Sequence, residues 1–343
     1  MLSSYFIGVL SSYRDTDVVA HFWRDRLHGY LFDIKDGKQR PYIIIGGRKV
    51  CYGSVFEKWK DYVVREELDG TITIDVRDEV LDRLAEFESK FDDIILAKKD
   101  ELEEWAKVHC SDEGKGILAN IFVAIYTDFT KDIAREVLKR LKIRTCPYCN
   151  RNYTFAVKSS CSSGKKRFTT RPEFDHFFSK SKHPLLALSF YNLVPSCPIC
   201  NHGKATENIG VNPYFDGFKS KFVICDKRSK TPLNINKIKL VKSDDFSIEF
   251  DNPSVAEQDN IKGLGLDVLY NEHKDYVMDL IEKSTCYGSM EQNQAIVDSF
   301  QGVFRSSQEV YDFVWGKYLD EDSFEYRPLA KLTRDILEQL GIE

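Results

Sequence analysis

The sequence predicts an α+β fold in which a basic module, stapled by cysteines, lies between mainly helical N- and C-terminal regions. Apolar residues recur with helical spacing at both ends of the chain of 343 residues, and two Cys-x-x-Cys pairs bracket a β-prone stretch between them. A chain of this length can form one large domain or two modest ones, each with an adequate core. The expected ranges are 1–141 for an N-terminal domain of unknown role, 142–242 for the basic module and 243–343 for the C-terminal region.

The N-terminal region is predicted to be mainly helical, with a small β element. From 15 to 30 the apolar residues follow helical spacing, and Asp15 is a candidate N-cap. Two short strands are expected next, at 41–45 and 71–76. Further helical segments are expected at 78–109, 117–127 and 130–141.

The middle of the chain is predicted to contain short strands. Two β-prone segments, 153–157 and 167–177, are separated by the polar loop 158–166 and should form a hairpin or near-hairpin. A short strand at 192–195 precedes the second cysteine pair, and a helix can begin at Asn201. Beyond this module we expect strands at 222–225 and 238–250 and helices from 254 to 343.

Four cysteines have the spacing of a structural zinc site. A two-residue gap lets both sulfurs of a pair reach one ion, and two such pairs complete a tetrahedral shell of four thiolates. The predicted ligands are Cys146, Cys149, Cys197 and Cys200. Five further cysteines are scattered singly and are expected to be reduced and mostly buried: Cys51, Cys110, Cys161, Cys225 and Cys286.

The net charge of −5 conceals a strong asymmetry along the chain. Between residues 131 and 242 there are 23 Lys and Arg against 7 Asp and Glu, a net charge of +16, which leaves −21 for the remainder. Basic surface attracts polyanions and supplies phosphate contacts, so this segment is predicted to face nucleic acid. The alternative is a solvated basic face that balances the acidic flanks.

The sequence predicts a cytoplasmic protein without a membrane contact. No uncharged apolar run is long enough to span a bilayer, and residues 1–13 lack the basic flank and cleavage site of a signal peptide. An odd number of cysteines, 9 in all, also argues against a disulfide framework.

Polar residues at three places between and after the cysteine pairs resemble a known signature. Asp175 and His176 lie in the second β-prone segment, Asn192 opens the next strand, and Asn201 follows the second pair directly. The order of cysteine pair, β segment with Asp-His, short β segment, cysteine pair and helix resembles the ββα-metal or HNH endonuclease family over residues 145–208. Cysteine pairs alone would instead be typical of a zinc ribbon or treble-clef module without chemistry.

The resemblance implies a role for each of these residues. His176 would be the general base that activates water, and Asn192 would brace the loop that orients it. Asp175 and Asn201 would be oxygen ligands of one catalytic cation, which suits Mg²⁺ or Mn²⁺. Successive residues of a strand face opposite ways, so Asp175 and His176 can serve one site only if the strand ends or bulges there.

Other polar residues of the module are expected to contact nucleic acid. His202 is an alternative ligand or phosphate contact, although a neighbouring helical residue points about 100° away. His183 is expected to be a phosphate contact or an idle loop residue rather than a base. The expected nucleic-acid contacts are Lys165, Lys166, Arg167, Lys180, Lys182 and Lys204.

Within the HNH families, residues 174–182 and 192–201 look most like the PtuB-type nucleases of Septu and retron-associated anti-phage systems. That resemblance implies an effector nuclease, acting on DNA, that is controlled by a partner ATPase of the ABC/SMC-like kind. Because the chemistry does not distinguish the sugars, an RNase, for example one that cleaves tRNA, is the alternative. A non-catalytic, zinc-dependent nucleic-acid-binding or adaptor module is the alternative from another class.

Overall fold

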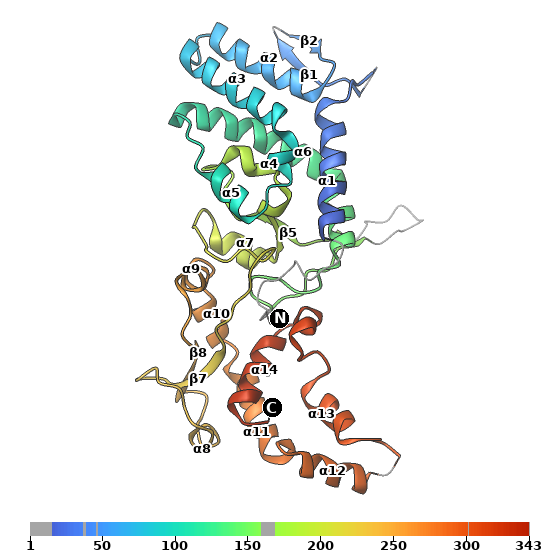
Figure 1. Ribbon diagram of the computed structural model, residues 1–343, viewed down its shortest axis with the longest axis vertical. Helices are drawn as coiled ribbons and strands as arrows, with labels where there is room; N and C mark the ends of the chain where they lie inside the picture. Colours follow the sequence, from blue (N-terminus) through green and yellow to red (C-terminus); the bar gives the residue numbers. More distant parts are fainter. Residues whose placement is uncertain (1–15, 37–38, 46, 159–168, 301, 343) are drawn as a thin grey trace. The chain divides into compact units, whose positions relative to one another are not determined.

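Figure 1 shows the computed structural model of the chain. It describes residues 16–36, 39–45, 47–158, 169–300 and 302–342. The described residues form two compact units, an N-terminal unit of 16–142 and 156–195 and a C-terminal unit of 143–155 and 196–342. Both cysteine pairs thus belong to the C-terminal unit, whereas the segment with Asp175 belongs to the N-terminal unit.

The N-terminal unit is built around helices that pack against one another (Figure 1). Their apolar residues are buried in its core. Helices α1 (Thr16–Phe32) and α3 (Ile74–Ser89) pack against the long helix α6 (Asp112–Leu141). Trp23 of α1 is fully buried, and its indole N–H donates to the carbonyl oxygen of Leu188 at 2.9 Å. The unit also contains β1 (Tyr42–Ile45), β2 (Arg48–Cys51), α2 (Val55–Leu68), α4 (Phe91–Ile95) and α5 (Lys99–Ala106).

Side-chain caps explain where several of these helices begin and end. The Ser54 hydroxyl accepts from the Glu57 N–H while the Glu57 carboxylate accepts from the Ser54 N–H, a reciprocal capping box at the start of α2. The Ser111 hydroxyl caps α6 by accepting from the Gly114 N–H. Lys142 ends α6 in the left-handed conformation, with φ of 54°.

Three elements of this region differ from those predicted. The strand predicted at 71–76 is wrong, because the Thr73 hydroxyl caps α3 and the β-branched run opens a helix instead. The stretch expected to be helical throughout 78–109 is divided into α3, α4 and α5, since the chain turns between them and buries the apolar residues of α4. The segments 117–127 and 130–141 are parts of one helix, because neither Gly nor Pro separates them.

Two short strand pairs lie in the segment between the cysteine pairs. Strands β3 (Val157–Lys158) and β4 (Thr169–Thr170) are antiparallel, so the predicted hairpin is present only in the residues next to its loop; its tip, 159–168, lies outside the described residues. Strand β5 (Glu173–His176) pairs with β6 (Leu193–Ser196), close to the strand predicted there. Two 3-10 helices lie between β5 and β6, η2 (Pro184–Leu188) and η3 (Phe190–Asn192).

The C-terminal unit combines one strand pair with helices. Strands β7 (Phe222–Asp226) and β8 (Phe246–Phe250) pair antiparallel, so the strand predicted at 238–250 is present only in its last part. Helix α14 (Ala330–Gln339) packs on β7, and its buried Asp335 accepts the first backbone N–H of that strand at 2.8 Å. The unit's other helices are α7 (Pro198–Lys204), α8 (Ile235–Ile238), α9 (Val255–Gly263), α10 (Leu266–Asn271), α11 (Lys274–Tyr287), α12 (Met290–Ser299), α13 (Ser307–Trp315) and η4 (Glu321–Tyr326).

The described residues form helices and short antiparallel strand pairs, so the coarse α+β class predicted from the sequence is confirmed. Among these residues, no helix combines the length and apolar character needed to cross a membrane. The finer expectation, a ββα-metal arrangement, stays a prediction.

Candidate functional site

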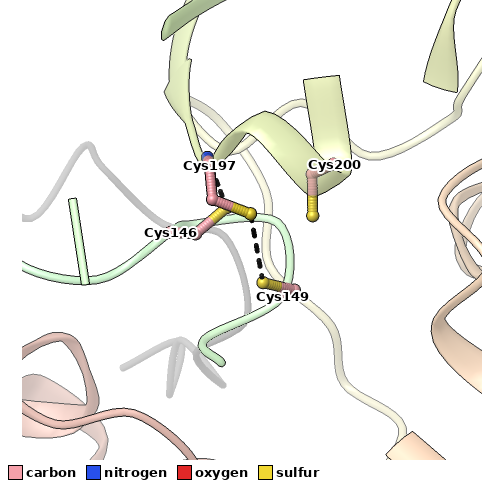
Figure 2. A group of neighbouring side chains, drawn as sticks. All are labelled: Cys146, Cys149, Cys197 and Cys200. Carbon is pink, nitrogen blue, oxygen red and sulfur yellow. Dashed lines mark hydrogen bonds between the residues drawn. The ribbon is translucent and has the colours of Figure 1, made fainter. Parts of the chain in front are cut away.

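Four cysteine side chains converge in the C-terminal unit (Figure 2). Cys146 and Cys149 lie on one loop, Cys197 is the N-cap of α7, and Cys200 follows within that helix. All four are buried, and their sulfur atoms lie within 4.8 Å of one another. Zinc bonds of about 2.3 Å in a tetrahedral site separate the sulfurs by about 3.8 Å, and the sulfurs of Cys149 and Cys197 are 3.9 Å apart. The cluster could therefore bind a structural zinc ion, as the sequence predicts.

N–H groups around the cluster donate to its sulfur atoms. The backbone N–H of Cys197 donates to Cys146 Sγ at 3.3 Å, and that of Arg151 donates to Cys149 Sγ at 3.4 Å. The side-chain amide of Asn152 donates to Cys197 Sγ at 3.5 Å. Donors of this kind stabilise the thiolate over the thiol, and the thiolate is the form that binds metal. They are the outer support that a metal–thiolate site requires.

The pKa values within the cluster diverge in opposite directions. Hydrogen bonds from Cys146, Cys149 and Cys200 hold the pKa of the Cys197 thiol well below its usual range. Burial raises the pKa of Cys146, and the hydrogen bond with Cys146 is the main cause of the raised pKa of Cys200. Each thiol must lose its proton before its sulfur can bind a metal ion. A cation bound at the centre would replace those protons.

Asn150, directly after the first cysteine pair, links the metal loop to the C-terminal helices. It is buried and adopts a φ of 45°, and its side-chain amide donates to the carbonyl oxygen of Phe324 at 2.9 Å. Its own carbonyl oxygen accepts from the Leu329 N–H at 2.6 Å. The buried Tyr270 hydroxyl donates to the carbonyl oxygen of Cys149 at 2.5 Å. Sequence reasoning missed this support; an asparagine, which tolerates positive φ, after the cysteine was the available signal.

His176 is the last residue of β5 and is 7% exposed. Its Nε2 lies 3.0 Å from the carbonyl oxygen of Ala187. Because a carbonyl oxygen only accepts, Nε2 carries the hydrogen and the neutral ring has its lone pair on Nδ1. The ring also meets Tyr126 of α6 edge-on, with the two centroids 4.8 Å apart. The imidazole is therefore fixed both in tautomer and in orientation.

Asn192 braces the loop that follows His176. Its side chain is fully buried; Oδ1 accepts from the Phe178 N–H at 2.7 Å, and Nδ2 donates to the carbonyl oxygens of Phe178 at 3.1 Å and Leu186 at 2.8 Å. One amide group thus holds the beginning and the end of the loop. Leu186 precedes Ala187, whose carbonyl accepts from the imidazole. These are the contacts that the bracing role predicted for Asn192 needs.

Asp175 is 3% exposed and lies one residue before the end of β5. The strand ends at His176, which is the condition under which neighbouring residues can serve one site. Burial lowers the pKa of Lys180, while the negative charge of Asp175 acts in the opposite direction. The Lys180 ammonium is 5.3 Å from the ring centroid of Tyr126, and burial raises the pKa of that tyrosine to about 12. No sequence motif marks Tyr126, which reaches this cluster through the packing of α6.

The remaining predicted residues have diverse environments. Asn201 and His202 lie on α7 of the C-terminal unit, where Asn201 is half-buried and His202 is exposed. Lys182 is exposed, as a phosphate contact requires. Lys204 is fully buried, which does not suit a phosphate contact, because the ammonium must reach the nucleic-acid backbone. The predicted contacts at the hairpin tip lie outside the described residues: Lys165, Lys166 and Arg167.

Comparison of the chain with protein-family models, with curated proteins and with solved structures gives no match. The C-terminal unit contributes four converging sulfurs, and the N-terminal unit contributes a fixed imidazole beside a buried carboxylate.

Proposed function

We propose that the chain is a metal-dependent endonuclease of the ββα-metal type, which hydrolyses phosphodiester bonds and acts preferentially on DNA. The observation that carries the proposal is His176, whose Nε2–H is bound to a carbonyl so that Nδ1 is the basic atom. A buried carboxylate, Asp175, precedes it directly. A general base beside an oxygen ligand for a cation is the minimum needed for metal-assisted hydrolysis of a phosphodiester.

Each residue has a defined part in the proposed reaction. His176 Nδ1 accepts a proton from water while the water oxygen attacks phosphorus. Asp175 supplies a hard oxygen ligand suited to Mg²⁺ or Mn²⁺. When bound, such a cation neutralises charge on the phosphate and on the leaving oxygen. Lys180, on the loop that follows β5, adds positive charge near the carboxylate.

Zinc at the four cysteines is proposed to be structural. Four thiolates complete a tetrahedral shell and leave no open position for water or substrate. The ion would hold the loop of Cys146 and Cys149 against the start of α7, and its binding energy would contribute to folding. The two metals therefore have separate roles and separate ligand types.

The proposal is tested by the substitution His176→Ala, with His21→Ala on an exposed face of α1 as the matched control. Supercoiled plasmid and labelled RNA are incubated in parallel with each variant and Mg²⁺ or Mn²⁺. We expect His176→Ala to abolish cleavage while zinc content and nucleic-acid binding are retained, because a base acts in the transition state. Asp175→Ala should recover part of its lost rate at high Mn²⁺.

Each other outcome identifies an alternative. Cleavage of the RNA alone would make the protein an RNase of the same fold. Nucleic-acid binding without cleavage of either substrate would indicate the non-catalytic adaptor module. Cleavage at the parental rate by the His176 variant would show that another group is the base.

The resemblance to PtuB-type nucleases leads us to propose that the enzyme is an anti-phage effector controlled by an ABC/SMC-like ATPase. Co-expression with a candidate ATPase of this kind, followed by co-purification, tests this. We expect a stable complex in which ATP changes the rate of DNA cleavage. A nuclease that neither binds the ATPase nor responds to ATP in its presence would contradict the proposed control.

A further inference from the structure

Two aromatic rings stand stacked and half-exposed just after the first cysteine pair. Tyr153 and Phe155 are each 46% exposed, their centroids are 4.7 Å apart and their planes differ by 18°. Thr154 between them is buried, so the backbone here directs alternate side chains inward and outward. Paired large rings are normally buried in the core of a protein or covered by a partner. These two rings lie outside the core, next to each other.

The backbone that bears the rings is held rigidly to the metal loop. The Cys146 N–H donates to the Asn152 carbonyl oxygen at 2.9 Å, and the Thr154 N–H donates to the Arg144 carbonyl oxygen at 2.8 Å. Asn152 also donates to the sulfur of Cys197. The rings are therefore presented on a short ladder that the cysteine cluster anchors, and little conformational entropy is lost when a ligand stacks on them.

The charge of this segment indicates the partner. The part of the C-terminal unit that bears the rings, 143–155, contains 2 Arg and no Asp or Glu. Arg144 is exposed, and its guanidinium stacks over the Tyr326 ring at 4.6 Å from the centroid. A purely apolar protein partner would not be attracted by positive charge, whereas nucleic acid combines anionic phosphates with flat bases that can stack on rings.

We propose that Tyr153 and Phe155 form a stacking platform for an unpaired nucleobase, so that this chain binds nucleic acid with a single-stranded segment in preference to a continuous duplex. In a duplex each base is covered on both faces by its neighbours, so a protein ring gains access only where a base is unstacked. The inference rests on the proposed function and specifies its substrate class.

The test uses the full chain carrying His176→Ala, which prevents cleavage from consuming the probe. Binding of a fluorescein-labelled oligothymidine is compared with binding of a blunt DNA duplex for Tyr153→Ala, Phe155→Ala and Tyr153→Phe. Phe313→Ala, on an α13 residue that is 76% exposed, is the matched control. We expect each alanine substitution at the platform to weaken binding of the single strand by about 5- to 150-fold. Tyr153→Phe and Phe313→Ala should bind as the parent does, and duplex binding should change little.

Zinc content and circular dichroism establish that each variant is folded. If Phe155→Ala does not fold, Phe155→Leu is used in its place, because it removes the ring without emptying the volume that the ring fills. Unchanged affinity for the single strand overturns the platform, as does an equal loss for single strand and duplex. A shift in oligomeric state with unchanged affinity would instead assign the rings to an interface between copies. Cleavage is not the readout of this test. Loss of single-strand binding by the variants therefore supports the platform even if the protein cleaves nothing. If the protein is a nuclease but its platform variants bind normally, the platform is refuted and the proposed nuclease function is not.

Discussion

Replacement of Asn192 is the sharpest test of how the His176 loop is held. Asn192→Ala removes three hydrogen bonds, those to the Phe178 N–H, the Phe178 carbonyl and the Leu186 carbonyl, in a fully buried position. With about 1 kcal/mol for each bond and a further cost for buried groups left unpaired, the loss of stability should be about 2–5 kcal/mol. Urea denaturation measures that loss, and plasmid cleavage measures the effect on His176.

Two further variants make this prediction specific. Ser189→Ala removes one buried hydrogen bond, to the Ile94 carbonyl oxygen, so it should cost about 1 kcal/mol and leave cleavage intact. Asn192→Asp keeps an acceptor for Phe178 but places a carboxylate against two carbonyl oxygens, so it should be as damaging as alanine at pH 8. The deficit should shrink at pH 5, because the repulsion raises the pKa of the new carboxyl and its protonated form can donate. If Asn192→Ala loses only about as much stability as Ser189→Ala and cleaves plasmid normally, the bracing role of Asn192 is refuted.

The remaining predictions concern the C-terminal unit. Cys200→Ser should reduce zinc from one ion per chain towards none and lower the melting temperature, which elemental analysis and thermal denaturation measure; a zinc-free parent that folds normally would contradict this. Asn150→Ala should destabilise the chain by about 2–4 kcal/mol in urea, because it removes buried bonds to Thr145, Phe324 and Arg327; an unchanged midpoint would show that this link is unimportant. Burial raises the pKa of Glu325 to about 7. Its protonated form therefore contributes stability that is fully present below about pH 4 and is lost as the pH rises through 7. The stability of Glu325→Gln relative to that of the parent should consequently be greater at pH 8 than at pH 5.

The sequence predicts the metal centre well because its information is local. Two residues between cysteines fix how far apart their sulfurs can lie, and only the meeting of the two pairs depends on the fold. The pairing beside the polar loop was similarly predictable from the two β-prone segments around it, although the hairpin is shorter than predicted. The strand predicted at 71–76 failed because the hydroxyl of Thr73 is a good helix cap, and capping outweighs the β propensity of its neighbours.

The support of the candidate site was not predictable in the same way. Ala187, which fixes the tautomer of His176, contributes only its carbonyl oxygen, and a backbone group leaves no mark on the sequence. Tyr126 and Tyr270 reach the two sites from helices far along the chain, so their roles arise from packing alone. Asn192 is different, because its position relative to Asp175-His176 resembles a known pattern, and its three hydrogen bonds agree with the part that this pattern implies.

The measurement that tests the central proposal most directly is plasmid cleavage by purified, zinc-loaded protein with Mn²⁺, run beside the His176→Ala variant. If His176 Nδ1 is the general base, the parent converts supercoiled plasmid to nicked or linear DNA, whereas the variant binds the plasmid and leaves it intact. Equal cleavage by the two proteins, or none by the parent on either DNA or RNA, would contradict the proposal.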